Sequence, residues 1–361
     1  EGNEQWNQTF GGSDWDMGYS VQQTTDGGYI ITGYTSSFGN GLYDVWLIKT
    51  DSEGNEQWNQ TFGGSEIDWG YSVQQTTDGG YIITGYTSSF GNGQEDVWLI
   101  KTDSQGNEEW NKTFGGSRGE DGRSVQQTSD GGYIITGYTR SYGNGVSDVW
   151  LIKTNSQGIE EWNQTFGGTD WDMGYSVQQT SDNGFILVGY TSSFGNGEPN
   201  DVWLIKTDSN GDSLWTKTFG GMPWEVGFSV IQTDDGGYVI AGAMDQSTDS
   251  EHDAWIIKTD AEGNEEWNEI YGGASEEYFY SIQQTTDNGY IITGKTSSYG
   301  NGNSDIWLIR LEGTGVPPVY EGPVWHVSTT GSDSNEGSES SPFATIQVGI
   351  DSSSNGDTVL V

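Results

Sequence analysis

The sequence predicts an all-β protein, a six-bladed β-propeller of four-stranded antiparallel blades, and three observations lead to this prediction. First, one tryptophan returns at spacings of 52, 52, 52, 53 and 52 residues, at Trp6, Trp58, Trp110, Trp162, Trp215 and Trp267. Second, each copy holds four short apolar runs separated by Gly, Asp, Asn and Ser. Third, the run Val45–Ile48 is apolar on both alternating faces, as in a strand that is covered on both sides. A ring of such sheets is a propeller.

The turns of the repeated unit place its four strands. The first copy predicts strands at residues 20–24, 29–35, 44–50 and 57–62. Asp26 and Gly27 tolerate the positive φ of a tight hairpin between the first two strands. The single extra residue of the fourth copy lies near Pro199, in a loop, where an insertion breaks no ladder hydrogen bond. The repeated tryptophans are therefore expected to pack between blades.

The two ends of the repeat array predict how the ring closes. The chain starts with a fourth strand, residues 5–10, and its last unit ends on a third strand, residues 305–311. We expect the first strand to complete the last blade, because an open sheet edge is a liability. The chain opens at Glu1, without a Met and inside what is elsewhere a turn, which indicates a fragment or a processed piece. The sequence therefore leaves undecided whether the natural ring has seven or eight blades instead of six.

Residues 1–312 form the predicted propeller, residues 313–323 a linker, and residues 324–361 a segment of different style. The repeats, with GGYIITGYT, DVWLIKT and WNQTFGG motifs, resemble uncharacterised secreted propeller repeats of bacteria and archaea, and at a lower level kelch repeats. The last segment resembles the start of a pectate-lyase-like right-handed parallel β-helix. Its resembling parts are a strand at residues 325–328, the loop GSDSNEGS, a helix at residues 342–351 and the run GDTVLV. The resemblances imply folds and no activity.

The charge of the chain excludes several partners. Asp and Glu number 53 against 12 Lys and Arg, which gives a formal net charge of -41. Such a surface repels nucleic acid and anionic lipid. The absence of cysteine excludes disulfides and thiolate sites, and no apolar run is long enough to span a membrane. The acidic surface is interpreted first as a solvated surface and second as a surface that binds cations.

The antiparallel order places the fourth-to-first and second-to-third loops on one face of the ring, and the tight turns on the other. The fourth-to-first loops differ most among the copies, so this variable face is the predicted binding face. Aromatic rings beside carboxylates suit sugars or cations. Alternatively, the rings cover the top of each blade. The candidate residues of this kind are Trp15, Asp16, Asp68, Trp69, Trp171, Asp172, Trp224, Glu225 and Tyr278.

Three of the four arginines fall on one blade, at Arg118, Arg123 and Arg140. Because guanidinium forks match carboxylates, one hypothesis is a local site for a carboxylated or sulfated glycan. The other hypothesis is that these arginines pair with Glu120 and Asp121.

No catalytic set can be assembled from the sequence. His252 and His326 lie in different domains, which excludes a Ser-His-Asp triad, and the turn before Trp58 lacks the spacing of a sialidase Asp box. Acid–base chemistry by paired carboxylates is left open, because it requires coordinates. No cofactor is predicted, and Ca²⁺ stays open because the DSEGN turns resemble calcium loops only faintly.

These observations predict a non-catalytic, monomeric propeller that lies outside the cell or at its surface and whose variable face binds a glycan or a surface protein. Two alternatives remain. The propeller is an accessory domain of a polysaccharide-degrading β-helix enzyme, or it is itself a glycan lyase or hydrolase that uses the blade with the three arginines.

Overall fold

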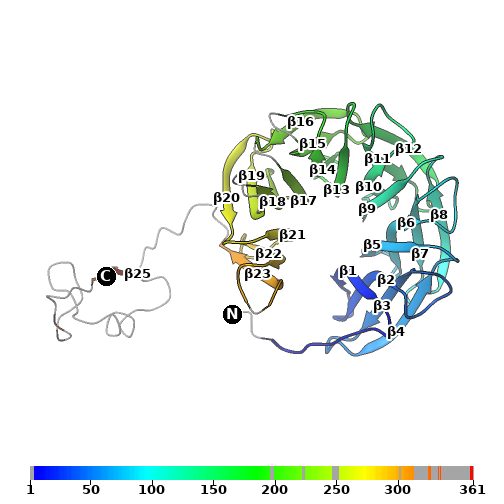
Figure 1. Ribbon diagram of the computed structural model, residues 1–361, viewed down its shortest axis with the longest axis horizontal. Helices are drawn as coiled ribbons and strands as arrows, with labels where there is room; N and C mark the ends of the chain where they lie inside the picture. The colour runs from blue at the N-terminus through cyan, green and yellow to red at the C-terminus, as the bar shows by residue number, and fades with distance from the viewer. Residues whose placement is uncertain are drawn as a thin grey trace. The chain divides into compact units, whose positions relative to one another are not determined.

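The computed structural model describes residues 4–195, 199–221, 224–245, 252–300, 302–312, 324–326, 332, 334 and 358–360. It divides into two units, one of residues 1–285 with 290–310 and one of residues 286–289 with 311–361. The first unit contains the repeats, and within it the blades follow one another around a central opening (Figure 1). In the described part of the chain, no helix is long and apolar enough to cross a membrane.

The first three blades are antiparallel sheets whose four strands pair in chain order. The first comprises β1 (Asp16–Gln23), β2 (Tyr29–Thr35), β3 (Asp44–Thr50) and β4 (Glu56–Phe62). The second comprises β5 (Asp68–Gln75), β6 (Tyr81–Thr87), β7 (Asp96–Thr102) and β8 (Glu108–Phe114). The third comprises β9 (Glu120–Gln127), β10 (Tyr133–Thr139), β11 (Asp148–Thr154) and β12 (Glu160–Phe166).

The remaining blades repeat this order. The fourth comprises β13 (Asp172–Gln179), β14 (Phe185–Thr191), β15 (Asp201–Thr207) and β16 (Ser213–Phe219). The fifth comprises β17 (Glu225–Gln232), β18 (Tyr238–Asp245), β19 (His252–Thr259) and β20 (Glu265–Tyr271). The sixth comprises β21 (Glu277–Gln284), β22 (Tyr290–Thr296) and β23 (Asp305–Leu311). The predicted all-β, six-bladed propeller is thereby confirmed.

The first strand of each blade is longer than predicted because it contains a β-bulge. In the second blade, pairing of β5 with β6 shifts register between Gly70 and Ser72 and then continues to Asp68. The bulge brings strand backbones together: a Cβ on Gly85 would lie 1.7 Å from the Trp69 carbonyl oxygen. Glycine at this position of β6 therefore allows the first strand to extend into the variable face.

The hydrophobic core lies between neighbouring blades. One cluster joins Leu47 and Phe62 of the first blade to Val73, Tyr81 and Trp98 of the second. All residues of β3, β7, β11 and β15 are buried, in agreement with their unbroken apolar patterns. The tryptophans of the third strands thus pack between blades, as the sequence predicts.

The tight turns on the opposite face are fixed by a repeated buried lysine. Lys101 is 2 % exposed, forms an ion pair with Asp78 at 2.9 Å and donates to the Thr102 carbonyl at 2.8 Å. Asp78 also accepts from the Thr76 hydroxyl and from the Gly80 amide. The same lysine–aspartate pair recurs in the first, third, fourth and fifth blades.

The last blade differs from the prediction, because its sheet has three strands. Residues 4–10 form no strand and are not part of this sheet. Trp6 instead packs on Tyr29, with ring centroids 5.5 Å apart, and donates to the Ser52 carbonyl at 3.1 Å. The first blade thus holds this segment through the Trp6 ring, as the second blade holds Trp58 through Tyr81. The expected closure by the first strand is not formed here, and Ile306 of β23 is 89 % exposed.

The second unit contains one described pair of strands. β24 (Val324–His326) pairs in parallel with β25 (Thr358–Leu360). The predicted linker at residues 313–323 and the predicted helix at residues 342–351 lie outside the described residues.

Candidate functional site

The variable face is assembled by backbone hydrogen bonds between the two kinds of loop. Within the first blade, the Ser36 amide donates to the Trp15 carbonyl at 2.8 Å. Between the first and second blades, the Asp68 amide donates to the Tyr43 carbonyl, also at 2.8 Å. Isolated parallel bridges repeat this link, joining Tyr43 to Ile67, Ser147 to Trp171 and Asn200 to Trp224. In the first four blades, the second-to-third loop therefore touches the fourth-to-first loop of its own blade and that of the next.

Four of the candidate carboxylates lie where they hold these loops together. Asp68 is fully buried and accepts hydrogen bonds from the Thr87 hydroxyl, the Ser89 hydroxyl at 2.6 Å and the Gly64 amide at 2.8 Å. Asp16 and Asp172 accept from equivalent groups of their own blades. Glu225 occupies the same position and is also fully buried. The sequence contained a signal for this role, because all six copies carry Asp or Glu here while the neighbouring loop residues vary.

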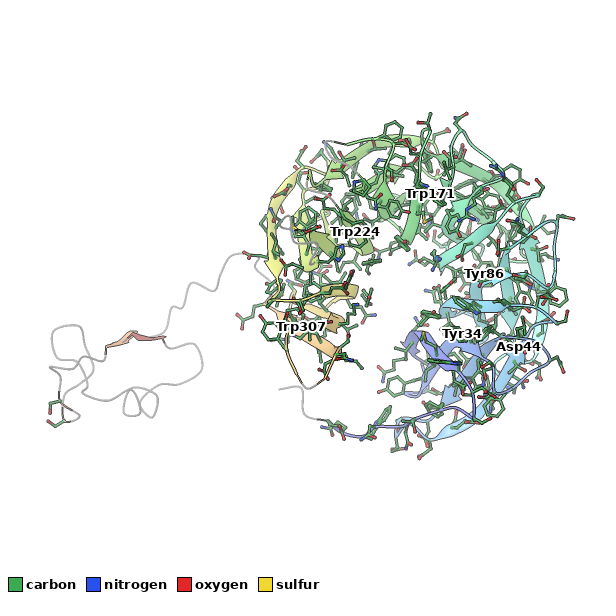
Figure 2. All side chains as sticks on the ribbon, viewed as in Figure 1. Tyr34, Asp44, Tyr86, Trp171, Trp224 and Trp307 are labelled. Carbon is green, nitrogen blue, oxygen red and sulfur yellow. The ribbon has the colours of Figure 1, made fainter. Side chains whose placement is uncertain are left out.

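The candidate aromatic residues divide into open and embedded rings. Trp15 is 72 % exposed and Trp171 is 38 % exposed. Trp69 stacks on Tyr34, with centroids 4.7 Å apart and planes at 16°. Trp224 packs on the His252 ring at 4.3 Å. Figure 2 shows Trp171 and Trp224 on neighbouring blades, with Tyr34 and Tyr86 farther around the ring.

Tyr278 belongs to the embedded group. Its hydroxyl lies 2.9 Å from His252 Nδ1, and the Lys295 ammonium lies 4.5 Å from the centroid of its ring. The pKa of Tyr278 is raised to about 12, mainly by burial, so the hydroxyl stays protonated at neutral pH. Tyr278 and His252 therefore link the fifth and sixth blades.

A collar of side chains on the innermost strands was missed by the sequence analysis. We define the inner collar as the equivalent positions of the six first strands: Tyr19, Tyr71, Arg123, Tyr175, Phe228 and Tyr280. Neighbouring rings lie 5.0 to 5.3 Å apart at the three all-aromatic contacts, and the Arg123 guanidinium lies 4.1 Å from the Tyr71 centroid. An alignment of the six copies could have revealed the inner collar, since five of its residues are aromatic and one is charged.

The charged member of the collar lines a pocket between the second and third blades. This cavity has a volume of about 240 Å³ and is lined by Tyr71, Tyr86, Glu95, Asp121, Arg123, Tyr138 and Arg140. Glu95 comes from the second-to-third loop of the second blade, and Asp121 follows the buried Glu120 on β9. We call this cavity the arginine pocket. Two of the three predicted arginines contribute to it.

The arginine pocket contains an ion pair between a buried carboxylate and a partly exposed guanidinium. Arg123 Nη2 lies 2.7 Å from Asp121 Oδ2, and the Asp121 side chain is 4 % exposed. Burial raises the pKa of Asp121 to about 6, Glu95 adds to the increase, and Arg123 opposes it. Among the described atoms, Asp121 Oδ1, Arg123 Nε and Arg140 Nε are buried without a hydrogen-bond partner. The pocket thus holds polar capacity that the fold itself does not use.

Arg140, which also lines the pocket, packs on two aromatic rings, and Arg118 contacts the Arg140 backbone. The Arg140 guanidinium lies 5.1 Å from the Trp171 centroid and 5.5 Å from that of Tyr138. Arg118 is exposed and donates to the Arg140 carbonyl at 3.2 Å. Of the two predicted acidic partners, Asp121 pairs with Arg123, whereas Glu120 accepts from the Gly116 and Ser141 amides.

The arrangement can bind an acidic group or a group of hydrogen-bond donors. Two guanidinium groups offer forked donors to a carboxylate or a sulfate, and Tyr71, Tyr86 and Tyr138 offer ring faces and hydroxyls. Within the described residues, no group of three or more His, Asp or Glu could hold a metal ion. Asp51 of the DSEGN turn instead accepts from the Asn55 and Glu53 amides.

The fold and the site define a repeat propeller in which one blade is chemically distinct. No family model matches the chain. The regulatory protein FlaEY of Caulobacter vibrioides is 22 % identical over 188 residues, which are 43 % of this chain and 20 % of that protein. The chain therefore spans about a fifth of the length of this relative.

Several solved structures are similar in outline. Sqt1 from Chaetomium thermophilum gives a TM-score of 0.45 at 9 % identity, over 84 % of each chain. The Pan2 WD40 domain of Neurospora crassa gives 0.47 at 8 % identity, over 82 % of this chain and 91 % of that one. A DUF4221 family member from Bacteroides vulgatus gives a TM-score of 0.45 at 9 % identity, over 81 % of this chain and 92 % of that one.

Proposed function

We propose that this protein is a non-catalytic binding propeller that holds an acidic group of a glycan or of a protein surface in the arginine pocket. The observation that carries the proposal is the pocket itself. The copies of the repeat are nearly identical scaffolds, whereas this boundary replaces Trp69 and Tyr71 of the preceding copy with Asp121 and Arg123. A buried carboxylate in an ion pair with unused donors costs stability, which favours a role in recognition.

The surroundings of the pocket fit a glycan or a protein segment. Trp171, beside Arg140, offers an exposed ring to a sugar face or an apolar side chain. The protein as a whole has a formal net charge of -41, so a long polyanion is repelled while a single acidic group can still reach the local arginines. As part of the proposal, we place the protein outside the cell or at its surface.

Replacing Arg123 should weaken binding of acidic probes by about tenfold to a hundredfold, because a hydrogen bond to a charged group contributes about 1.5–3 kcal/mol. The measurement is an array of uronic-acid, sialylated, sulfated and neutral glycans, with poly-glutamate peptides beside them. The variant is Arg123→Gln with Asp121→Asn, which removes both charges and leaves no unpaired buried ion.

A control is Arg310→Gln, which removes a guanidinium from an exposed position on β23. We expect this control to bind acidic probes as the wild type does. The proposal is wrong if the wild type binds no acidic probe, or if the double variant binds them as strongly as the control does.

A further inference from the structure

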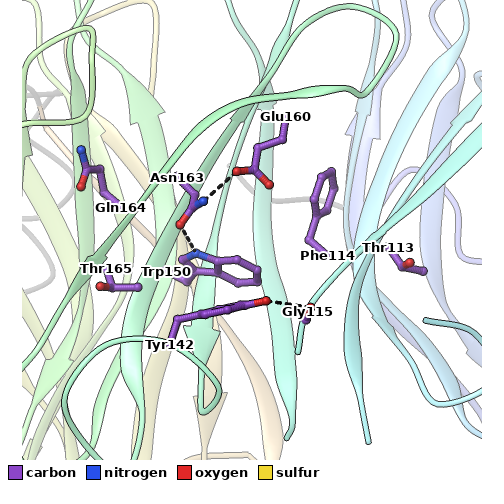
Figure 3. Close-up of a pocket in the computed structure, with 9 residues that line it drawn as sticks. All are labelled: Thr113, Phe114, Gly115, Tyr142, Trp150, Glu160, Asn163, Gln164 and Thr165. Atoms are coloured by element: carbon purple, nitrogen blue, oxygen red, sulfur yellow. Dashed lines mark hydrogen bonds between the residues drawn. The ribbon is translucent and has the colours of Figure 1, made fainter. Parts of the chain in front are cut away.

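A groove on the outer rim lies on another part of the third blade. It has a volume of about 470 Å³ and is lined by Thr113, Phe114, Gly115, Tyr142, Trp150, Glu160, Asn163, Gln164 and Thr165 (Figure 3). The groove runs between the end of β8 and the outer strand β12. Its lining shares no residue with that of the arginine pocket.

The floor of this groove is held rigidly. Trp150 Nε1 donates to Asn163 Oδ1 at 3.0 Å, and Asn163 Nδ2 donates to Glu160 Oε1 at 2.7 Å. The Tyr142 hydroxyl donates to the Gly115 carbonyl of the preceding blade at 2.9 Å (Figure 3). The Tyr142 ring lies over the buried Trp150, with centroids 5.4 Å apart, yet is 45 % exposed. An aromatic face is thus fixed and open to solvent.

The exposed ring recurs at the same position of five blades. We call these residues the rim rings: Phe38, Phe90, Tyr142, Phe194 and Tyr299, which are between 45 and 50 % exposed. Each lies 5.4 to 5.6 Å from the tryptophan of its own third strand. The bonds from tryptophan to asparagine to glutamate also recur, in the first, second, third and fifth blades.

The chemistry of the groove matches a neutral sugar. A flat ring face accepts the apolar C–H face of a pyranose, while the carboxylate, amide and hydroxyl groups of Glu160, Gln164 and Thr165 can bond its hydroxyls. A glutamate in the groove of a protein with net charge -41 disfavours an anionic ligand. Repetition around the rim adds the geometry of a multivalent binder.

We propose that the rim rings form a repeated set of sites for neutral sugar residues of a polysaccharide. Each site binds weakly alone, and several sites together bind strongly. This function is separate from recognition of an acidic group in the arginine pocket. Because linked sites gain effective concentration, avidity exceeds the affinity of one site by about a hundredfold or more.

The test replaces all five rim rings with leucine in the full chain. Leucine still covers the tryptophan beneath, so circular dichroism and the Tm should remain near those of the wild type, while the aromatic faces are lost. Binding is measured by biolayer interferometry on immobilised β-glucan, mannan, galactan and xylan. We expect the wild type to bind at least one of these polysaccharides, and the five-ring variant to bind it about a hundredfold more weakly.

Two controls separate this proposal from the first. The single variant Tyr142→Leu should lose only a small part of the avidity, and Arg123→Gln with Asp121→Asn should bind the neutral polysaccharide as the wild type does. The rim proposal is overturned if the wild type binds none of the four polysaccharides, or if the folded five-ring variant binds unchanged. Either outcome leaves the acidic-probe experiment unaffected.

Discussion

Replacing Leu99 with alanine should lower the free energy of unfolding by about 2–5 kcal/mol, the usual cost of truncating a buried leucine. Leu99 is fully buried in a cluster with Ile82 and Val97 of its own blade and Val125 and Ile135 of the next. The change therefore opens a cavity at a boundary between blades. Chemical denaturation followed by tryptophan fluorescence measures the loss.

The repeat supplies a matched control for this experiment. Leu308 occupies the same position of the last blade but is 58 % exposed, because no following blade packs on β23 among the described residues. Leu308→Ala should change stability by less than about 1 kcal/mol, as surface substitutions do. A loss as large as that of Leu99→Ala would contradict the open face of the last blade.

Stability should be greatest between about pH 4 and pH 6, because two repeated sets of carboxylates have pKa values shifted in opposite directions. Burial raises the pKa of Asp44 and Asp148, and raises that of Asp96 to about 6. A carboxyl whose pKa is raised on folding destabilises the folded state when it is ionised. Its cost is present above the folded pKa and disappears as the pH falls toward the unfolded value of about 3.9.

The carboxylates of the tight turns act in the opposite direction. Hydrogen bonds from Thr24, Gly28 and Lys49 lower the pKa of Asp26 to about 2. At Asp78, burial opposes the same kind of bonds, but the pKa is still lowered to about 2. Their stabilisation is complete above the unfolded pKa and is lost as the pH falls toward 2.

Thermal unfolding from pH 2 to pH 8 at constant ionic strength measures this profile. Asp96→Asn should flatten its alkaline side, and Asp78→Asn should flatten its acidic side. A Tm that rises steadily up to pH 8 in the wild type would show that the buried carboxylates of the third strands do not carry the expected cost.

The sequence predicted the scaffold well because the repeat supplies the evidence several times over. The strand at residues 29–35 and the buried strand at residues 44–50 match the structure in both bounds. The start of β1 was missed, since the bulge at Gly18 lets pairing continue to Asp16. Periodicity cannot show a bulge, because the extra residue breaks the alternation.

The candidate site was predicted only in part, because a residue pattern does not distinguish a ligand contact from a loop contact. Asp68 and Trp69 stand side by side in a variable loop, yet the structure buries the carboxylate and stacks the ring on Tyr34. Arg123 and Arg140 do meet in one cavity. The contribution of Glu95 was not foreseen, because it comes from the preceding blade.

The difference between copies is more informative than any single motif. Tyr71 and Arg123 occupy the same position of successive blades, and so do Trp69 and Asp121. The scaffold is unchanged by these exchanges, since β6 and β10 are identical in sequence and strand length. The third blade therefore differs from the second in its surface chemistry and not in its fold.

The most direct test of the arginine pocket is a crystal structure of the full chain with the acidic glycan or peptide that binds most strongly on the array. We expect an acidic group of the ligand to lie in the cavity between the second and third blades, within hydrogen-bond distance of the Arg123 or Arg140 guanidinium. A ligand that is ordered elsewhere on the protein, with this cavity empty, would contradict it.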